Sequence, residues 1–588
     1  MNESKLSQKS STQSSLPLTE ARSKDLNLSS YTVGALPLIN HIIDRMRLED
    51  ILKGYLKLKG RKPKIPISKV LLLLLRNFIV AREPLYGVGE WAARQAPDLL
   101  GLEKKQINNL NDDRVGRSLD RLFDADHVSF LLAVTRHVIQ EFQVELDELH
   151  NDSTTISFFG KYEEAFKGRK KRGKPTRAIL LGHNKDHRPD LKQLLFILTV
   201  SRDGGVPIHF TASDGNVTDD QTHRQTWDLL CTLTGRKDFL YVADSKLATT
   251  DNMSYIQRNG GRFVTVLPRT RSEDSEFREF VRHNPGSISW HEIFRKTKRK
   301  GKREEVYDIF SMEDSPRVTA EGYRLFWYHS LRKEERDRVH RAKKIERALG
   351  ALGELKERLW SPRTRFQEKV KVQEAVDKIL EETGASLWIL VEVKNREQIR
   401  FRQDHCGRPG KNTRYVKDHR MRFDISFEID TVAVAADSIT DGIFPLATND
   451  TELTDLEVLL AYKGQPVIEK RFSQLKTDFE VAPVYLKEVA RIEALLCMYY
   501  LVLVVQALLE REIRSQMADK GITSIPLYPE GRACRAPSAR RIIDLFENIQ
   551  RHELKQKGRL EILVTQLTPL QKKVLKLLGM STCHYRVD

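Results

Sequence analysis

Hydrophobic residues recur at helical spacing through the first part of the chain. Four segments between Tyr31 and Phe123 carry apolar positions three and four residues apart, and short breaks such as Glu83-Pro84-Leu85-Tyr86-Gly87 divide them. This periodicity predicts amphipathic helices joined by tight connections. We therefore expect a helical N-terminal domain over residues 31–125 that binds DNA, with a helical bundle that makes only protein contacts as the alternative. Residues 1–30 are polar and Ser-rich, with too little apolar surface to build a core, so we expect a disordered tail there.

The pattern changes to that of strands near residue 140. Five apolar or alternating segments follow one another, and an amphipathic helix over 220–233 lies between the third and the fourth. The candidate strands span 148–160, 194–200, 207–210, 239–243 and 262–266. A turn at Asp203-Gly204-Gly205 joins the second and third as an antiparallel hairpin. Three strands, a helix and a further strand are the order of a ribonuclease H-like sheet, so we expect an α/β ribonuclease H-like core beginning over 140–268.

The chain then leaves this order. Residues 269–441 mix strand-like segments with a highly charged helical segment over 334–359, which predicts an inserted β-rich and helical subdomain. Residues 442–510 return the chain to the core. Amphipathic segments with Pro and Gly breaks follow over 511–588, which predicts a helical C-terminal region.

The longest apolar run is 494–509. It contains Gln506 and is flanked by Glu493 and Glu510. The run is shorter than the roughly 20 residues that a membrane-spanning helix needs. We therefore expect a buried core helix and no membrane segment.

The charge balance indicates a polyanionic partner. The 588 residues include 99 Lys and Arg against 81 Asp and Glu, a net charge of +18. In a long chain without a membrane segment, such an excess favours nucleic acid over a membrane surface. The five cysteines lack paired or metal-ligand spacing, and the N-terminus lacks the apolar core of a signal peptide. Both features predict reduced thiols and a cytoplasmic protein.

Two Gly-broken basic runs, 169–174 and 295–303, are candidates for phosphate contact. The residues that we predict to bind DNA in these runs are Lys170, Lys171, Arg172, Lys298, Arg299 and Lys300. The alternative for both runs is a solvated charged face. The loop 182–190 contains two His and two Asp residues, which could bind zinc, but no further Cys or His cluster completes such a site. A structural or DNA-contacting loop is the preferred interpretation.

Three acidic residues stand at positions where carboxylates carry chemistry. Asp152 lies in the first strand, with Asp147 as its competitor for the same role. Asp244 directly follows the buried segment 239–243. A charge at the end of a buried strand is costly unless it is used, which favours a functional role for Asp244.

The third acidic residue lies in the stretch 462–476, YKGQPVIEKRFSQLK. Pro466 suits the first position of a helix, so we expect a helix to begin there. Glu469 and Lys476 then lie nearly two turns apart on one face. Ile468, Phe472 and Leu475 repeat at helical spacing and are expected to face a core. The alternative is an amphipathic surface helix with incidental charges.

The stretch resembles the Tyr-Arg-Glu-Lys signature of DDE transposases of bacterial insertion sequences, the IS-four-like superfamily. Tyr462, Glu469 and Lys476 stand at the signature spacing, while Gln465 replaces the Arg. Lys463 or Arg471 could supply the missing positive charge. Asp-Ser-Thr-Thr at 152–155 resembles the first acidic motif of the family, and Asn-Asp-Asp-Arg at 111–114 resembles its N-terminal domain.

The resemblance implies a ribonuclease H-like catalytic core interrupted by a β-rich insertion. Asp152, Asp244 and Glu469 would converge to hold two Mg²⁺ ions, for which Mn²⁺ can substitute, because both prefer oxygen ligands. Lys476 and Arg471 would contact DNA, and Tyr462 would stabilise a distorted base at the cleaved end.

The implied reaction cuts double-stranded DNA at the terminal inverted repeats of the element and joins the 3′ ends to target DNA. A homodimer would pair the two ends in a nucleoid-associated complex of a bacterial cell. Two alternatives remain: a ribonuclease H-like nuclease without strand transfer, and a non-catalytic DNA-binding protein derived from a transposase.

Overall fold

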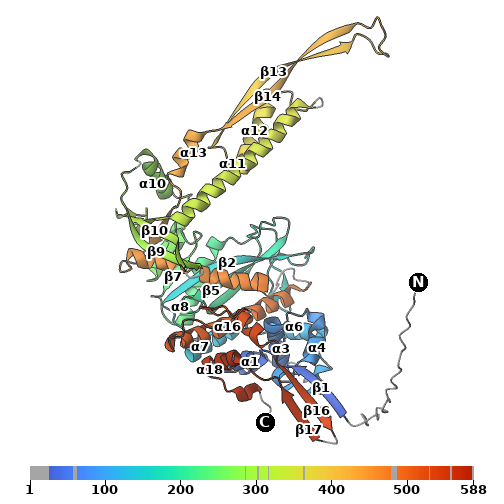
Figure 1. Ribbon diagram of the computed structural model, residues 1–588, viewed down its shortest axis with the longest axis vertical. Helices are drawn as coiled ribbons and strands as arrows, with labels where there is room; N and C mark the ends of the chain where they lie inside the picture. Colours follow the sequence, from blue (N-terminus) through green and yellow to red (C-terminus); the bar gives the residue numbers. More distant parts are fainter. Residues whose placement is uncertain are drawn as a thin grey trace, which may run out of the picture. The chain divides into compact units, whose positions relative to one another are not determined.

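The computed structural model describes residues 26–56, 63–284, 286–300, 303–314, 317–361, 364–478, 486–528, 530–556 and 559–585 (Figure 1). The chain forms two compact units. The first contains residues up to 145, 153–217 and 467–588, and the second contains 146–152 and 218–466. The strand β2 (Glu148–Phe158) therefore begins in the second unit and continues into the first.

The N-terminal part of the first unit is helical. Its helices are α1 (Leu36–Arg45), α2 (Leu48–Tyr55), α3 (Ile67–Val80), α4 (Val88–Arg94), α5 (Lys104–Ile107), α6 (Asp112–Asp124) and α7 (His127–Phe142). The sequence Asn-Asp-Asp-Arg explains where α6 begins. The Asn111 side chain accepts a hydrogen bond from the backbone N–H of Arg114 at 2.9 Å, and two aspartates occupy the first turn. Cap and charge both stabilise a helix N-terminus.

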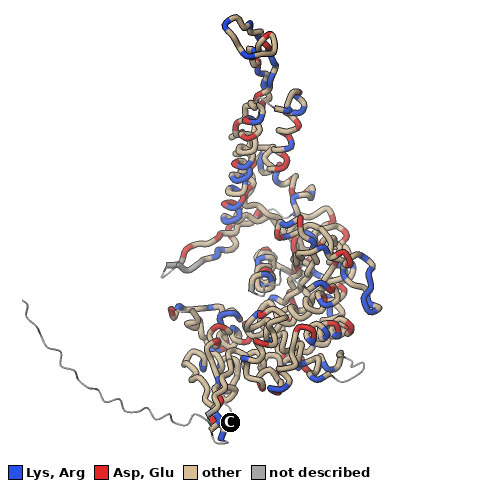
Figure 2. The backbone as a smooth tube through the Cα atoms, turned by 90° about the vertical axis from the view of Figure 1, so that its right-hand side faces the viewer, with Lys and Arg blue, Asp and Glu red and all other residues tan. Residues whose placement is uncertain are grey.

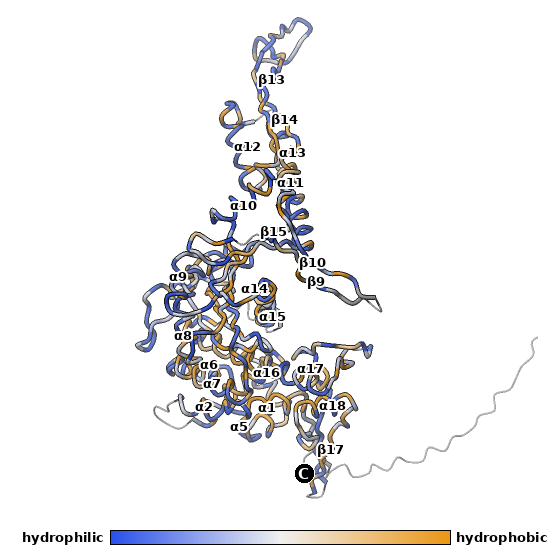
Figure 3. Tube along the Cα trace, turned by 90° about the vertical axis from the view of Figure 1, so that its left-hand side faces the viewer, coloured by the Kyte–Doolittle hydropathy of each residue, from blue (hydrophilic) through white to orange (hydrophobic). Residues whose placement is uncertain are grey.

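The helix α16 (Val489–Asp519) is the core of the first unit (Figure 3). It packs against α1, α3, α6 and β6 (Pro207–Ser213), and against the C-terminal helices α17 (Ala539–Phe546) and α18 (Pro569–Leu577). By length and composition it could cross a membrane, but 94% of its most apolar 18-residue window is buried inside the protein. The expected buried helix is therefore confirmed.

Strands from both ends of the chain form a sheet that the sequence did not predict. β1 (Leu26–Thr32), β16 (Gln550–Gln556) and β17 (Arg559–Val564) pair in antiparallel order. The disordered tail predicted over 1–30 is therefore wrong for residues 26–30, while residues 1–25 lie outside the described residues. The C-terminal region is not wholly helical. β1 and β16 are short and largely polar, and β1 takes its partner from the far end of the chain, so local periodicity carries no signal of the pairing.

The first unit also holds the predicted hairpin. β5 (Lys192–Ser201) pairs antiparallel with β6 and lies beside β2. A second, very short hairpin, β3 (Lys170–Lys171) and β4 (Lys174–Pro175), contains the first basic run.

The second unit is built on a mixed sheet with the strand order β2-β7-β8-β15-β12-β10-β9. Its further strands are β7 (Leu240–Ala243), β8 (Arg262–Val266), β9 (Trp290–Lys300), β10 (Arg303–Glu313), β11 (Arg317–Val318), β12 (Arg324–Ser330) and β15 (Ile443–Thr448). β2, β7 and β8 run parallel, and the later neighbours are antiparallel. β12 lies within the predicted insertion, yet it shares this sheet. The helices of this part are α8 (His223–Thr234), α9 (Thr250–Arg258), α10 (Ser272–His283) and α14 (Asp455–Tyr462).

A separate core holds the segment between β12 and β15. Its elements are α11 (Leu331–Trp360), α12 (Lys369–Thr383), β13 (Ile389–Gln403), β14 (Tyr415–Ile429) and α13 (Thr431–Ser438). Leu352, Val376 and Ile425 are fully or almost fully buried in its hydrophobic cluster. The charged helix expected over 334–359 is α11. The hairpin β13–β14 packs on the two helices near its base and extends beyond them (Figure 1).

Candidate active site

Parallel pairing brings two of the predicted carboxylates together. Asn151 of β2 is in register with Ala243 of β7, so Asp152 and Asp244 are the next residues along two neighbouring strands. Neighbouring strands lie about 4.8 Å apart. Both aspartates are half-buried, and each follows a buried stretch of its own strand. The second unit thus holds a pair of adjacent carboxylates at the carboxyl end of β7.

Local hydrogen bonds fix the backbone at Asp244. Oδ1 of Asp244 accepts a hydrogen bond from the backbone N–H of Lys246 at 3.0 Å. Its main-chain carbonyl accepts one from Oγ1 of Thr265 at 2.8 Å. No Lys or Arg side chain among the described residues forms an ion pair with this carboxylate. Its remaining lone pairs are therefore available to an external cation.

The carboxylate pair offers the hard oxygen donors that Mg²⁺ prefers. Across the described ranges, however, no group of three or more His, Cys, Asp or Glu side chains is placed to hold a metal ion. Asp152 and Asp244 can thus supply two ligands of a divalent cation, but not a complete set. The remaining ligands have to come from water, from substrate or from a further side chain.

Glu469 belongs to the first unit. It lies in the first turn of α15 (Pro466–Ser473), which begins at the proline as predicted. The helix N-terminus favours a carboxylate at this position. The side chain is exposed and makes no hydrogen bond or ion pair with any described residue.

The turn before α15 is fastened to the strand that carries Asp152. A hydrogen bond of 2.9 Å joins Nδ1 of His150 to Oε1 of Gln465, and another of 2.9 Å joins its Nε2 to Oε1 of Glu148. His150 is fully buried. A Cβ added to Gly464 would lie 2.6 Å from Cε1 of His150, so only glycine permits this approach. In the sequence, Gln465 stands out only as a departure from the signature, and His150 belongs to no motif that predicts a role.

Tyr462 is half-buried at the end of α14, where its ring lies 6.4 Å from that of Phe444. The ammonium of the next residue, Lys463, lies over the rings of Phe310 and Phe444 at 4.6 and 4.7 Å. Burial lowers the pKa of Lys463 to about 8, against the opposing effect of Asp308. The signature tyrosine is thus packed on the aromatic core of the second unit.

The prediction that Arg471 binds DNA is wrong. The residue is 1% exposed. Its guanidinium donates to the carbonyls of Gly204 and Gly205, both at 2.8 Å, and to Oε1 of Gln474 at 2.7 Å. It also pairs with Oε2 of Glu510 at 3.1 Å. All its hydrogen-bonding capacity faces the interior of the first unit, so no surface remains for DNA.

Lys476 is half-buried and pairs with the loop 182–190. Its Nζ lies 2.6 Å from Oδ1 of Asp186. The loop is anchored by Asn184, which donates to Oγ of Ser157, and by Lys185, which donates to the carbonyl of Ser153. Since the described residues hold no three-ligand group, the zinc alternative for this loop has no support. The loop instead carries the counter-ion of the signature lysine.

The first basic run borders a charged cleft of about 550 Å³ in the first unit. Its lining consists of Arg117, Asp120, Arg121, Asp124, Arg172 and Lys174. Arg172 pairs with Asp124 at 2.8 Å and Lys171 with Glu488 at 2.8 Å, while Lys170 is exposed. The second run belongs to β9, and the side chains of Lys298, Arg299 and Lys300 lie outside the described residues.

Comparison with known proteins identifies two parts of the chain. Residues 147–505 match the family described as Transposase DDE domain, and residues 28–135 match a Domain of unknown function (DUF4277). No curated protein sequence matches the chain.

Two solved structures are similar to part of the chain. One is a cryo-EM structure of the piggyBac transposase synaptic complex with hairpin DNA, at 9% identity and a TM-score of 0.22, covering 49% of this chain and 57% of that one. The other is the Mos1 transposase paired-end complex with left transposon end, at 10% identity and a TM-score of 0.14, covering 35% and 60%. The chain thus spans less than two thirds of either neighbour.

Proposed function

Since the chain belongs to the Transposase DDE domain family, we propose that it is a transposase that cuts DNA at the terminal inverted repeats of an insertion sequence and joins the 3′ ends to target DNA. The observation that carries the proposal is the carboxylate pair. Asp152 and Asp244 fall inside the matched range and stand at adjacent positions of two parallel strands. A divalent cation would offset the cost of holding two half-buried carboxylates side by side.

The proposed cofactor is Mg²⁺, with Mn²⁺ as a substitute. Asp152 and Asp244 would hold it, with Glu469 as the third protein ligand. When bound, a divalent cation supplies a lowered pKa for an attacking water or 3′-hydroxyl and charge stabilisation of the leaving oxygen. Glu469 suits this role because its carboxylate is exposed and makes no bond to a described residue.

The chain's own residues would position the substrate. Lys476 would exchange Asp186 for a DNA phosphate, since a partly exposed ion pair is weak and easily replaced. Tyr462 would offer one edge of its half-buried ring to a base at the cleaved end. The hydrogen bonds between Gln465, His150 and Glu148 would hold the turn before α15 against β2. A homodimer that pairs the two element ends, and a cytoplasmic location, belong to the same proposal.

The test is a strand-transfer assay with labelled DNA that carries the flanks of the gene, a target plasmid and Mg²⁺. We expect joined products from the wild type and none from Asp244→Asn or Glu469→Gln, with DNA affinity within twofold of wild type. Asp251→Asn is the matched control, because that exposed carboxylate lies on the surface of α9 and pairs only with Arg224 among the described residues.

Each other result has a definite meaning. Cleavage without joining by the wild type would support the nuclease alternative, and binding without cleavage would support the non-catalytic one. Metal-dependent cleavage retained by both variants would overturn the site assignment.

A further inference from the structure

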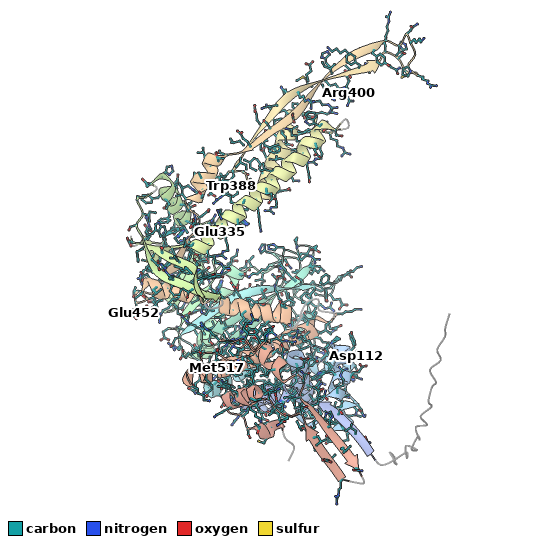
Figure 4. All side chains as sticks on the ribbon, in the orientation of Figure 1. Asp112, Glu335, Trp388, Arg400, Glu452 and Met517 are labelled. Atoms are coloured by element: carbon teal, nitrogen blue, oxygen red, sulfur yellow. The ribbon has the colours of Figure 1, made fainter. Side chains whose placement is uncertain are left out.

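The hairpin β13–β14 is longer than the core that supports it. Its strands pair without interruption from Ile389↔Ile429 to Gln403↔Tyr415. A strand of this length spans about 50 Å. Trp388 lies at the base of the hairpin and Arg400 lies far along it, beyond the ends of α11 and α12 (Figure 4). We call the distal part, residues 394–422, the arm.

Only the base of the hairpin is held by a core. Val393 and Ile425 are buried against α11 and α12. Farther out, Ile399, Phe401 and Met421 are 45%, 67% and 61% exposed. A two-stranded hairpin without a packed face is marginally stable in water. The arm therefore has little packing to stabilise it and exposes both of its faces.

The register divides the arm into two unlike faces, because directly opposed residues of an antiparallel pair lie on the same face. The pairs Arg396↔Arg422, Gln398↔Arg420 and Arg402↔Val416 belong to one face, and the pairs between them to the other. The first, the basic face, carries Lys394, Arg396, Arg400, Arg402, Arg420 and Arg422. The second carries the exposed apolar residues Ile399, Phe401, Met421 and Tyr415.

The three acidic residues of the arm offset only part of this charge, since residues 394–422 contain ten Lys and Arg. Glu397 is bonded to His419 and Asp418 to Arg420, while Asp404 lies near His405. By contrast, several basic side chains have no hydrogen bond or ion pair with any described residue. They are Arg400, Arg402, Arg408, Lys411, Arg414 and Lys417. Lys and Arg gather along the distal arm in Figure 2.

We infer that the arm is a second DNA-binding element, which lies along duplex DNA with its basic face toward the phosphates and binds without sequence preference. Unpaired cations on a projecting ribbon, exposed except for the half-buried Arg400, are what a polyanion recognises. A two-stranded ribbon is also narrow enough for the major groove. The choice of duplex DNA over another polyanion rests on the proposed function. The charge of the arm and the register of its strands are independent of that proposal.

The arm and the carboxylate pair belong to different parts of the second unit. Asp152 and Asp244 lie at β2 and β7, whereas the arm follows α12 and projects from its own core. The arm would therefore add affinity for DNA outside the cleavage site, including DNA of unrelated sequence.

The test uses the full-length protein and a fluorescent duplex of about 30 base pairs with no sequence from the element's ends. Arg400→Glu/Arg402→Glu should weaken binding at least tenfold. It should also reduce the slope of log K against the logarithm of the salt concentration by about 2 in magnitude, since roughly one counterion is released per phosphate contact and two contacts are lost. The matched control is Lys371→Glu/Lys378→Glu on α12, which makes the same charge change at exposed positions of the same subdomain and should have less than a twofold effect.

Two results would overturn the inference. Equal effects of the two double variants would mean that only net charge matters. The second result would show that the arm contacts another copy of the chain. In that case Phe401→Ser/Met421→Ser would dissociate a dimer in sedimentation experiments, while Arg400→Glu/Arg402→Glu would bind DNA as the wild type does.

The measurement is independent of catalysis. Running it in the Asp244→Asn background keeps the DNA intact. If the wild type fails to cut its flanks but the arm variant still loses affinity, the proposed function fails and the arm inference stands. If the wild type cuts and joins its flanks but the arm variant binds DNA as tightly as the wild type, the arm inference fails and the proposed function stands.

Discussion

Glu510 and Asp244 are carboxylates in different units of the protein, and they differ in their partners: Glu510 has two cationic partners, and Asp244 has none among the described residues. Glu510 lies within α16 of the first unit and is completely buried. Lys470 and Arg471 pair with it at 2.7 and 3.1 Å, and the backbone N–H of Ala539 donates to it at 2.9 Å. Burial alone would raise the pKa of Glu510, but Arg471 and Lys470 hold it below the ordinary value.

Asp244 of the second unit has no such ion-pair partners among the described residues. Its carboxylate is half-buried and receives one backbone N–H, from Lys246. The two carboxylates differ in whether their oxygens are already bonded. Every donor around Glu510 is already committed, whereas the oxygens of Asp244 still have capacity for a cation. Position beside a core therefore does not distinguish a functional carboxylate; the state of its partners does.

The largest expected effect on stability comes from Glu510→Gln. Removing one partner of a buried charge network leaves Arg471 and Lys470 uncompensated, which costs about 3–5 kcal/mol. We expect a loss of this size in the free energy of unfolding by urea denaturation. Glu469→Gln, on the exposed side of α15, should change it by less than about 0.5 kcal/mol. A loss below about 1 kcal/mol for Glu510→Gln would remove the contrast.

The next effect is pH-dependent and concerns Glu493, also on α16. Burial raises the pKa of Glu493 to about 7, although its carboxylate accepts a hydrogen bond from the backbone N–H of Arg177 at 2.8 Å. An unfolded glutamate has a pKa near 4.5. The folded state therefore keeps a proton that the unfolded state releases, so the contribution of Glu493 to stability is fully present below pH 4.5 and is lost as the pH rises to about 7.

Glu493→Gln should remove this cost. At pH 8 the variant should be more stable than the wild type by up to about 3 kcal/mol, and at pH 4 the two should be equal. Urea denaturation from pH 4 to pH 8 measures the difference. Glu561→Gln is the control, since that residue is exposed and has no ion pair with any described residue, and it should show the pH dependence of the wild type. A constant offset between wild type and Glu493→Gln would contradict the assigned cause.

Local sequence patterns were sufficient where the determining contacts are local. Alternation and the apolar run before Asp244 located β7, and Pro466 located the start of α15. The pairing of β1 with β16 was not accessible, because two short polar strands from opposite ends of the chain carry no local signal of each other.

The burial of Arg471 can be predicted from the spacing of its apolar neighbours in the sequence. Ile468, Arg471, Phe472 and Leu475 follow the spacing of a single helix face, so the arginine shares the buried side of α15. Its partner, Glu510, directly follows the apolar run 494–509. A cation on one predicted core face and an anion at the end of another together indicate a buried pair rather than a DNA contact.

A smaller effect is expected at the turn before α15. Gln465→Ala leaves the buried imidazole of His150 without one of its two partners, which costs about 1–3 kcal/mol. Gln465→Glu retains an acceptor at the same position and should recover most of the stability. If the turn positions Glu469, Gln465→Ala should also lower the maximal rate of cleavage more than the affinity for DNA. Equal stability of the Ala and Glu variants would argue against the hydrogen bond to His150.

The smallest expected effect on stability is at the ion pair of Lys476 with Asp186. The pair is partly exposed, and such pairs contribute about 0.2–1 kcal/mol. Lys476→Gln and Asp186→Asn should therefore destabilise the fold slightly and equally. They should differ in DNA affinity at low salt: Lys476→Gln removes a phosphate contact and weakens binding, while Asp186→Asn frees the lysine and leaves binding unchanged or stronger. Equal losses of affinity from both substitutions would instead make the pair a structural clamp for the loop 182–190, like the pairs around Glu510 and unlike Asp244.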